Sequence, residues 1–475
     1  MTDPGTFAKQ WQEAFPYPPT HGQSEAIGHI SEYITRKGND SMFLLKGYAG
    51  TGKTSLISSL VNMLKHLRMR SVLLAPTGRA AKVISSYSGR RAYTIHRKLY
   101  MQSIASDGRI RFVLTENKHK NTLFIVDEAS MIPDTSASDG GIFSGKRLLQ
   151  DLMEYVYSGE NCRLLMIGDT AQLPPVGIDL SPALHPDYLK NNFNLRIISY
   201  ELREVVRQSR ESGILANATE LREKISDNRM DMPFFHNAGY DDVFRVDGNE
   251  LQEFLQDVYA SSRQEDIVVI CRSNKRANIY NREIRNRILY HEDELCAGDH
   301  LMVVRNNYFW LPRGSEAGFI ANGDMIEILR IRNIKQLYGH RFADVTFRLI
   351  DYPEEKEIDA LIMLDTLMAD SPALPQDEQK RLLENVMLDY ANIPSYSMRM
   401  SKVSQNQYFN ALQVKFAYAL TCHKTQGGQW KHVFVDQGYL KEDMVDREYL
   451  RWLYTSLTRA SVKVYLINFL DRFWE

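Results

Sequence analysis

The sequence predicts an α/β protein with two domains, each built around a mainly parallel β-sheet. Its 475 residues are about three times the length of a typical single domain, so more than one hydrophobic core is expected. Both halves alternate short aliphatic runs with helix-like stretches, and the runs are apolar at consecutive positions. That pattern is typical of strands buried on both faces and joined by crossover helices.

The strand-like runs divide evenly between the halves of the chain. They span residues 42–50, 71–77, 122–130 and 163–170, and then 266–274, 415–423, 432–438 and 463–469. Between 329 and 400 the pattern changes to short antiparallel strands, followed by an acidic helical stretch near 376–388. We therefore predict a first domain over residues 1–200, interrupted by an insert at 97–121. The second domain covers residues 201–475 and holds a small β-rich insert at 329–400.

Composition excludes several classes of protein. Hydrophobic residues make up 44% and charged residues 25%, which is ordinary for a globular chain. No apolar run reaches 18 residues, so we expect no membrane-spanning helix and no membrane partner. The first 30 residues lack the layout of a secretory signal. The four cysteines have no C-x-x-C spacing, which argues against a structural zinc or a disulfide framework and favours a cytoplasmic location.

The net charge of −1 conceals two opposite segments. Residues 65–120 hold 13 Lys or Arg against two acids, whereas residues 351–384 hold ten acids against three bases. A basic block of this kind suits the binding of a polyanion, although a solvated surface is an open alternative. The acidic segment is unsuited to wrapping DNA.

One segment has the pattern of a nucleotide-binding loop. Residues 47–54, GYAGTGKT, follow an apolar strand and precede a helix-like stretch, as G-x-x-x-x-G-K-[ST] requires. Its glycines let backbone N–H groups converge on phosphate oxygens at a helix N-terminus. Lys53 would neutralise the β/γ-phosphates, and Thr54 would bind Mg²⁺. The predicted cofactors are thus ATP and Mg²⁺, and the predicted contacts are Gly47, Gly50, Thr51, Gly52, Lys53, Thr54 and Ser55.

Acidic and amide side chains follow the next strands. Asp127 and Glu128 end the strand at 122–126, where Asp127 would hold Mg²⁺ and Glu128 would polarise the attacking water. Such a pair is weak evidence alone. Beside a P-loop it favours hydrolysis of the nucleotide by water over the transfer of a phosphoryl group to a substrate, which is the reaction of a kinase. Gln172 follows the strand at 163–167, and its amide suits sensing of the γ-phosphate because it can donate or accept.

Further blocks occur in order along the chain, at 19–23 (PTHGQ), 74–81 (LAPTGRAA), 94–96 (TIH), 202–209 (LREVVRQS), 421–427 (TCHKTQG) and 454–460 (YTSLTRA). With the P-loop and the acid pair, they resemble the motifs of superfamily 1 DNA helicases. The match is to the 5′-to-3′ branch, superfamily 1B, which includes RecD and phage Dda. This resemblance implies two RecA-like P-loop NTPase domains with ATP between them.

The resemblance also implies roles for individual residues. Gln23 would read adenine, and Arg207 and Arg459 would act as arginine fingers from the second domain. Together with Lys53, Glu128 and Gln172 they form the predicted catalytic set. The residues predicted to contact single-stranded nucleic acid are Pro76, Thr77, Thr94, His96, Thr421 and His423.

The two inserts fit the same family. A D-G turn between alternating residues predicts a β-hairpin in 97–121, where the family carries its strand-separating pin. The predicted wedge residues are Ser106, Asp107, Gly108 and Phe112, although a plain surface hairpin is an alternative. The I-A-N-G-D sequence at 320–324 resembles the turn that precedes the SH3-like insert of this branch.

The sequence as a whole predicts an ATP-dependent DNA helicase that moves 5′-to-3′ on single-stranded DNA and unwinds duplexes, with roles in repair or recombination. A superfamily 1 RNA helicase or remodelling ATPase is the alternative, because discrimination of the 2′-hydroxyl is not legible in one sequence. The third alternative is a P-loop switch protein or kinase that does not translocate. The expected partners are single-stranded DNA and single-strand–duplex junctions. The acidic insert would dock on the pin or engage a protein partner, and we expect a monomer.

Overall fold

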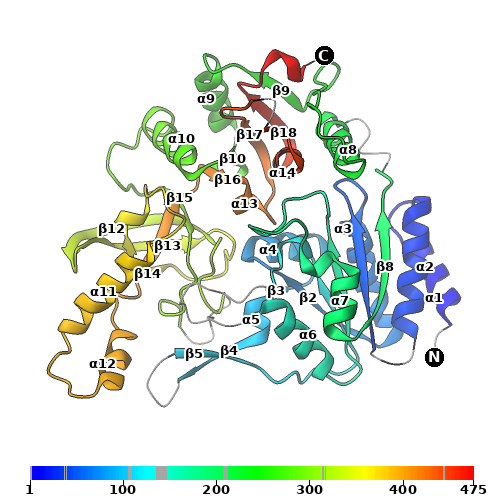
Figure 1. Ribbon diagram of the computed structural model, residues 1–475, viewed down its shortest axis with the longest axis horizontal. Helices are drawn as coiled ribbons and strands as arrows, with labels where there is room; N and C mark the ends of the chain where they lie inside the picture. The colour runs from blue at the N-terminus through cyan, green and yellow to red at the C-terminus, as the bar shows by residue number, and fades with distance from the viewer. Residues whose placement is uncertain are drawn as a thin grey trace.

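We describe a computed structural model of the chain, shown in Figure 1. The residues described are 3–36, 38, 40–104, 110–134, 147–206, 212–312, 315, 317–441 and 444–474. They form two parallel sheets with flanking helices, a closed β-barrel and a two-stranded hairpin. Within these residues, no helix is both long and apolar enough to cross a membrane.

The first sheet has six strands in the order β3-β2-β6-β7-β1-β8, and all its neighbouring strands are parallel. The strands are β1 (Ser41–Gly47), β2 (Arg70–Ala75), β3 (Ala92–Thr94), β6 (Thr122–Val126), β7 (Arg163–Gly168) and β8 (Arg196–Leu202). β8 pairs with β1 as far as Leu202, two residues beyond the predicted boundary at 200.

Helices cover both faces of this sheet. They are α1 (Pro4–Glu13), α2 (His21–Thr35), α3 (Lys53–Met63), α4 (Gly78–Ser88), α5 (Ile95–Leu99), α6 (Leu148–Ser158) and α7 (Pro186–Phe193). Phe43 and Leu45 of β1 pack in one core cluster with α1 to α4, whereas Met42 and Leu44 pack in another with α5 to α7. This two-sided burial is the reason for the continuous apolar runs in the sequence.

The second sheet has five parallel strands in the order β16-β10-β17-β18-β9. They are β9 (Val243–Val246), β10 (Ile267–Cys271), β16 (Ala419–Thr421), β17 (Trp430–Asp436) and β18 (Ala460–Ile467). The helices of this unit are α8 (Gly213–Ser226), α9 (Leu251–Ser261), α10 (Asn274–Arg287), α13 (Cys422–Thr425) and α14 (Arg447–Leu457). The prediction of two RecA-like α/β cores is confirmed.

A closed five-stranded barrel adjoins the second sheet (Figure 1). Its strands are β11 (His300–Val303), β12 (Met325–Leu337), β13 (His340–Leu349), β14 (Ile358–Met363) and β15 (Leu412–Phe416). The barrel starts before residue 329 and ends after residue 400, so it is longer than the predicted insert. The sequence did not reveal this because β11 and β15 are short and buried at every position, as are the strands of the parallel sheets. The predicted run 415–423 is accordingly divided between β15 and β16.

Two helices follow β14 and lie against the barrel. They are α11 (Gln376–Leu388), which matches the predicted acidic helix, and α12 (Tyr396–Val403). Leu382 and Val386 of α11 and Val403 of α12 share a core cluster with Phe342 of β13. The barrel's interior is continuous with the core of the second sheet, so the barrel belongs to the second unit.

A hairpin projects from the first unit after α5. It consists of β4 (Tyr100–Ile104) and β5 (Ile110–Leu114), paired antiparallel from Tyr100–Leu114 to Ile104–Ile110. The predicted wedge residues Ser106, Asp107 and Gly108 lie outside the described residues, and Phe112 pairs with Gln102 through the backbone of β5.

Candidate functional site

The loop between β1 and α3 has the geometry of a phosphate cradle. Gly50 and Gly52 have φ angles of 75° and 80°, in the left-handed region that glycine tolerates best. A Cβ on Gly52 would also overlap Nε2 of Gln23, so a side chain there would displace the Gln23 amide from the loop. α3 begins at Lys53, which places the loop's N–H groups at the positive end of an 11-residue helix.

Lys53 and Thr51 fold back onto the same loop. Lys53 Nζ donates hydrogen bonds to the carbonyls of Gly47 at 2.6 Å and Tyr48 at 2.8 Å, and Thr51 Oγ1 donates to the Tyr48 carbonyl at 2.8 Å. Thr54 is exposed at the start of α3, and Ser55 follows it, half-buried. The ammonium group is thus held at the mouth of the cradle, where it can exchange carbonyl oxygens for phosphate oxygens.

Gln23 lies against the P-loop. Its Oε1 accepts the N–H of Thr20 at 3.0 Å in the capping box that starts α2. Its Nε2 donates to the Thr51 carbonyl at 3.1 Å. The structure therefore brings the predicted adenine-reading residue to the nucleotide loop, and a role in adenine recognition stays a prediction.

The acid pair lies at the same edge of the sheet, because the carboxyl ends of parallel strands share that edge. Asp127 Oδ2 accepts the hydroxyl of Tyr87 at 2.7 Å, and its Oδ1 accepts the N–H of Glu128 at 2.9 Å. Glu128 has a φ of 53°, unusual for a residue with a side chain. Burial raises the pKa of Glu128, and the neighbouring charges of Arg459 and Lys53 act in the opposite direction.

Gln172 is buried, with 6% of its surface exposed. Its Oε1 accepts no hydrogen bond within the part of the chain that the structure describes. A buried amide oxygen without a partner is uncommon away from functional sites. Gln172 lies four residues after the end of β7, which is the strand between those that carry the P-loop and the acid pair.

Arg459 reaches this edge from the second unit. It follows α14 and is 4% exposed, and its Nη1 lies 3.9 Å from Glu128 Oε1. Its Nε and Nη1 also donate to the carbonyls of Thr455 and Gly428, each at 3.2 Å. Arg207, the other predicted finger, lies outside the described residues. Val206, just before it, donates its N–H to the Gly50 carbonyl at 3.0 Å.

Contacts between the units include residues that the motifs contain but that were not predicted as functional. Thr455 Oγ1 accepts the N–H of Leu173 at 2.9 Å, and Gln426 Nε2 donates to the Leu173 carbonyl at 2.5 Å. Thr455 is fully buried in α14. Its burial could mark it as functional only once the helix and its buried face are known, so the sequence alone did not reveal it.

The predicted nucleic-acid contacts also follow strand ends. Pro76 and Thr77 come after β2, Thr94 ends β3, and Thr421 ends β16, just before His423. Thr77 and Thr94 use their hydroxyls to cap α4 and α5, each accepting an N–H at 3.2 Å. A Cβ on Gly427 would lie 3.1 Å from Thr77 Oγ1, so the two units meet here.

Both predicted histidines favour the neutral form. Burial lowers the pKa of His96 to about 4 and lowers the pKa of His423 as well. Neutral imidazoles contribute hydrogen bonds and ring contacts but no charge, and the His96 ring lies 5.9 Å from that of Tyr100. In the free protein these two side chains therefore offer hydrogen bonds rather than positive charge.

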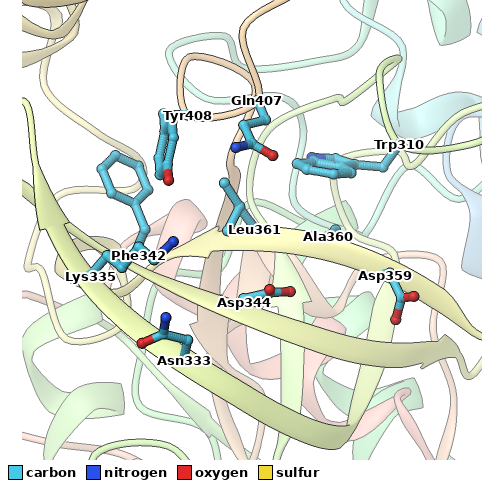
Figure 2. Close-up of a pocket in the computed structure, with 10 residues that line it drawn as sticks. All are labelled: Trp310, Asn333, Lys335, Phe342, Asp344, Asp359, Ala360, Leu361, Gln407 and Tyr408. Atoms are coloured by element: carbon cyan, nitrogen blue, oxygen red, sulfur yellow. The ribbon is translucent and has the colours of Figure 1, made fainter.

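A separate cavity of about 230 Å³ lies on the barrel (Figure 2). Trp310, Phe342 and Tyr408 form its aromatic walls, and Asp344 and Asp359 lie among the strands beneath them. None of the residues predicted to bind ATP or DNA lines it, so it is distinct from the P-loop site.

A phosphate cradle, an acid pair and an arginine from a second core define a P-loop nucleoside-triphosphatase whose site lies between two domains. Two family models match the chain, one over the first core and the start of the second unit, and the other over the end of the second core. The model described as an AAA domain matches residues 19–233, and the one described as a UvrD-like helicase C-terminal domain matches residues 416–467.

Named proteins are similar to the chain as well. The ATP-dependent DNA helicase Dda of Enterobacteria phage T4 is 26% identical over 294 residues, which cover 60% of each protein. The ATP-dependent RecD2 DNA helicase of Deinococcus radiodurans is 30% identical over 179 residues, 38% of this chain and 22% of RecD2. Among solved structures, a Pif1 helicase from Bacteroides in complex with ADP-AlF3 and ssDNA has a TM-score of 0.48 at 14% identity. That alignment covers 95% of this chain and 92% of the Pif1 chain.

The family matches fall in both α/β cores, and the chain is similar in sequence to the two DNA helicases Dda and RecD2. The chain spans less than two thirds of the length of either of those helicases.

Proposed function

We propose that the chain is an ATP-dependent DNA helicase that moves 5′-to-3′ on single-stranded DNA and separates duplex strands. The observation that supports this best is the approach of Arg459, from the second core, to Glu128 of the first. A site completed by a residue of the opposite core is formed only when the cleft closes, which couples hydrolysis to domain motion.

Each side chain of the site has a proposed task. Lys53 binds the β/γ-phosphates, and Glu128 orients and polarises the attacking water. Arg459 and Arg207 neutralise charge that develops on the transferred phosphoryl group. Mg²⁺, held by Thr54 and Asp127, would supply further charge neutralisation at the phosphates. Gln172, whose amide oxygen accepts no hydrogen bond from the described residues, senses the γ-phosphate.

The track for single-stranded DNA runs over the strand ends of both cores. Pro76, Thr77, Thr94 and His96 grip it on the first core, and Thr421 and His423 on the second. Their hydroxyl and neutral imidazole groups suit contacts that do not depend on base sequence. Alternate gripping by the two cores moves the strand as the cleft opens and closes.

We assign the remaining elements as follows. The domain boundary falls between β8 and α8, the β4–β5 hairpin is the strand-separating pin, and the five-stranded barrel is the SH3-like insert. The acidic helix α11 has two acids in its first turn, so it is suited to a basic protein partner rather than to DNA. The protein acts as a monomer.

Unwinding of tailed duplexes tests the proposal. With ATP and Mg²⁺, a duplex with a 5′ single-stranded tail should be separated, whereas one with a 3′ tail or blunt ends should persist. ATP hydrolysis should rise with single-stranded DNA and much less with single-stranded RNA of the same sequence. Unwinding of the 3′-tailed duplex would refute the polarity, and stimulation by RNA alone would favour an RNA helicase.

The pin gives a second prediction. Replacing residues 106–112 with a short Gly-Ser turn should leave DNA-stimulated ATPase activity and single-strand translocation largely intact, because the motor residues lie elsewhere. Unwinding of a 5′-tailed duplex should fall to background. The change removes Arg109 and Arg111, so the assays are run at saturating DNA and low salt to offset weaker binding. Unimpaired unwinding would place strand separation on another element.

A further inference from the structure

Tyr454 links two loops of the first core through a single hydroxyl group. It lies in α14 of the second core and is 1% exposed. The hydroxyl donates to Asp169 Oδ2, just after β7, at 2.6 Å, and accepts the N–H of Ala49 in the P-loop at 2.9 Å. A phenol has one proton to donate and lone pairs to accept, so both bonds form together.

The surroundings keep this phenol protonated. Burial raises the pKa of Tyr454 well above its ordinary value, and the neighbouring Asp169 carboxylate raises it further. The hydroxyl is therefore protonated near neutral pH and can donate to Asp169. Asp169 is itself 1% exposed and has a second fixed bond, from the N–H of Ala171 at 2.9 Å. The link thus joins groups that are already held in place.

Two further contacts with the first core involve this helix and the residues that follow it. Thr455 bonds to Leu173, at the end of the loop that starts with Asp169, and Arg459 lies beside Glu128. Tyr454 and Thr455 lie in the last turn of α14, and Arg459 follows two residues after the helix ends at Leu457, so their positions are coupled. Tyr454 thus connects the P-loop to the end of α14 that immediately precedes Arg459.

We propose that Tyr454 is a positioning residue whose hydroxyl couples the P-loop and the Asp169 loop to α14, and so sets the approach of Arg459 to Glu128. This inference rests on the proposed function. Without the hydroxyl, Ala49 N–H and Asp169 Oδ2 lose a buried partner, and α14 is held against the first core by fewer bonds. Closure stimulated by DNA should then align the site less often.

Tyr454→Phe tests the proposal because it keeps the ring and removes only the hydroxyl. We expect DNA-stimulated kcat to fall about tenfold, equivalent to ~1.4 kcal/mol in the barrier. The Kd of a fluorescent ATP analogue and that of a single-stranded oligonucleotide should change less than about twofold. Asp169→Asn should produce a similar loss, and the double variant should be no slower than the single ones, because both remove the same link.

Tyr449→Phe is the matched control. Tyr449 lies in the same helix, is 2% exposed, and its hydroxyl accepts Gln437 Nε2 at 3.2 Å within the second core. It should keep DNA-stimulated turnover close to that of the unaltered protein. Thermal melts of all variants distinguish a loss of coupling between the cores from a loss of folding. If Tyr454→Phe does not fold, Asp169→Asn is used as the test variant in its place.

Three results would overturn the assignment. They are normal turnover by Tyr454→Phe, an equal loss in Tyr449→Phe, and additive losses in the double variant. An unaltered protein with no DNA-stimulated hydrolysis would instead refute the proposed function, so the two failures are distinguishable.

Discussion

Replacing Glu128 with glutamine should lower DNA-stimulated ATP turnover by about 10³-fold or more while leaving ATP bound. Glutamine has nearly the same shape but cannot polarise water as a carboxylate does. The cradle of Gly50, Gly52 and Lys53 is untouched by this change, so nucleotide affinity should persist. Steady-state phosphate release and equilibrium binding of a fluorescent ATP analogue measure the two quantities separately.

Lys53→Ala provides the contrast. It removes the only charge that the P-loop itself offers to the phosphates, so both turnover and nucleotide affinity should be lost. Glu160→Gln is the matched control, because Glu160 is an exposed acid paired with Lys120 on the surface of the same core. Turnover of Glu128→Gln at the level of the unaltered protein would show that another group activates the water.

The two sheets were predictable because each strand is buried on both faces. In β1, alternate residues pack into different core clusters, so no polar position interrupts the run. The helix at 376–388 was predictable for the opposite reason. Its charged residues face solvent while Leu382 and Val386 are buried at helical spacing.

The extent of the barrel was not predictable from the same pattern. Phe416 pairs with Leu301 in the barrel, and Ala419 pairs with Val269 in the second sheet, yet the residues between them are equally buried. No charge or turn residue marks the change from one sheet to the other. Only the long-range pairing separates β15 from β16.

Within the site, local motifs were predictable and contacts between the cores were not. The P-loop owes its form to neighbouring residues, and its glycines are recognisable from spacing alone. Leu173 and Thr455, however, are 282 residues apart, and no periodicity relates one position to the other. The same is true of Tyr454 and Ala49, whose bond depends on how the two cores pack.

Replacing Arg459 with alanine should lower ATP turnover by about 10³-fold or more, because its guanidinium would no longer neutralise charge in the transition state. Arg459→Lys should recover only a small part, since an ammonium lacks the planar fork that bonds to Thr455 and Gly428 carbonyls while facing Glu128. Arg207→Ala should have an effect of similar size if it is the second finger. Single-turnover hydrolysis at saturating ATP and DNA measures these losses.

Binding of single-stranded DNA without nucleotide distinguishes a finger from a DNA contact. Arg459 is buried against the acid pair rather than among the threonines and histidines of the proposed track, so its loss should leave DNA affinity nearly unchanged. Arg447→Ala is the matched control, because Arg447 begins α14, the helix that precedes Arg459, and bonds to Asn228 at the surface. A variant of Arg459 with normal turnover and weakened DNA binding would move this arginine to the track. Arg207 is judged by the same pair of measurements.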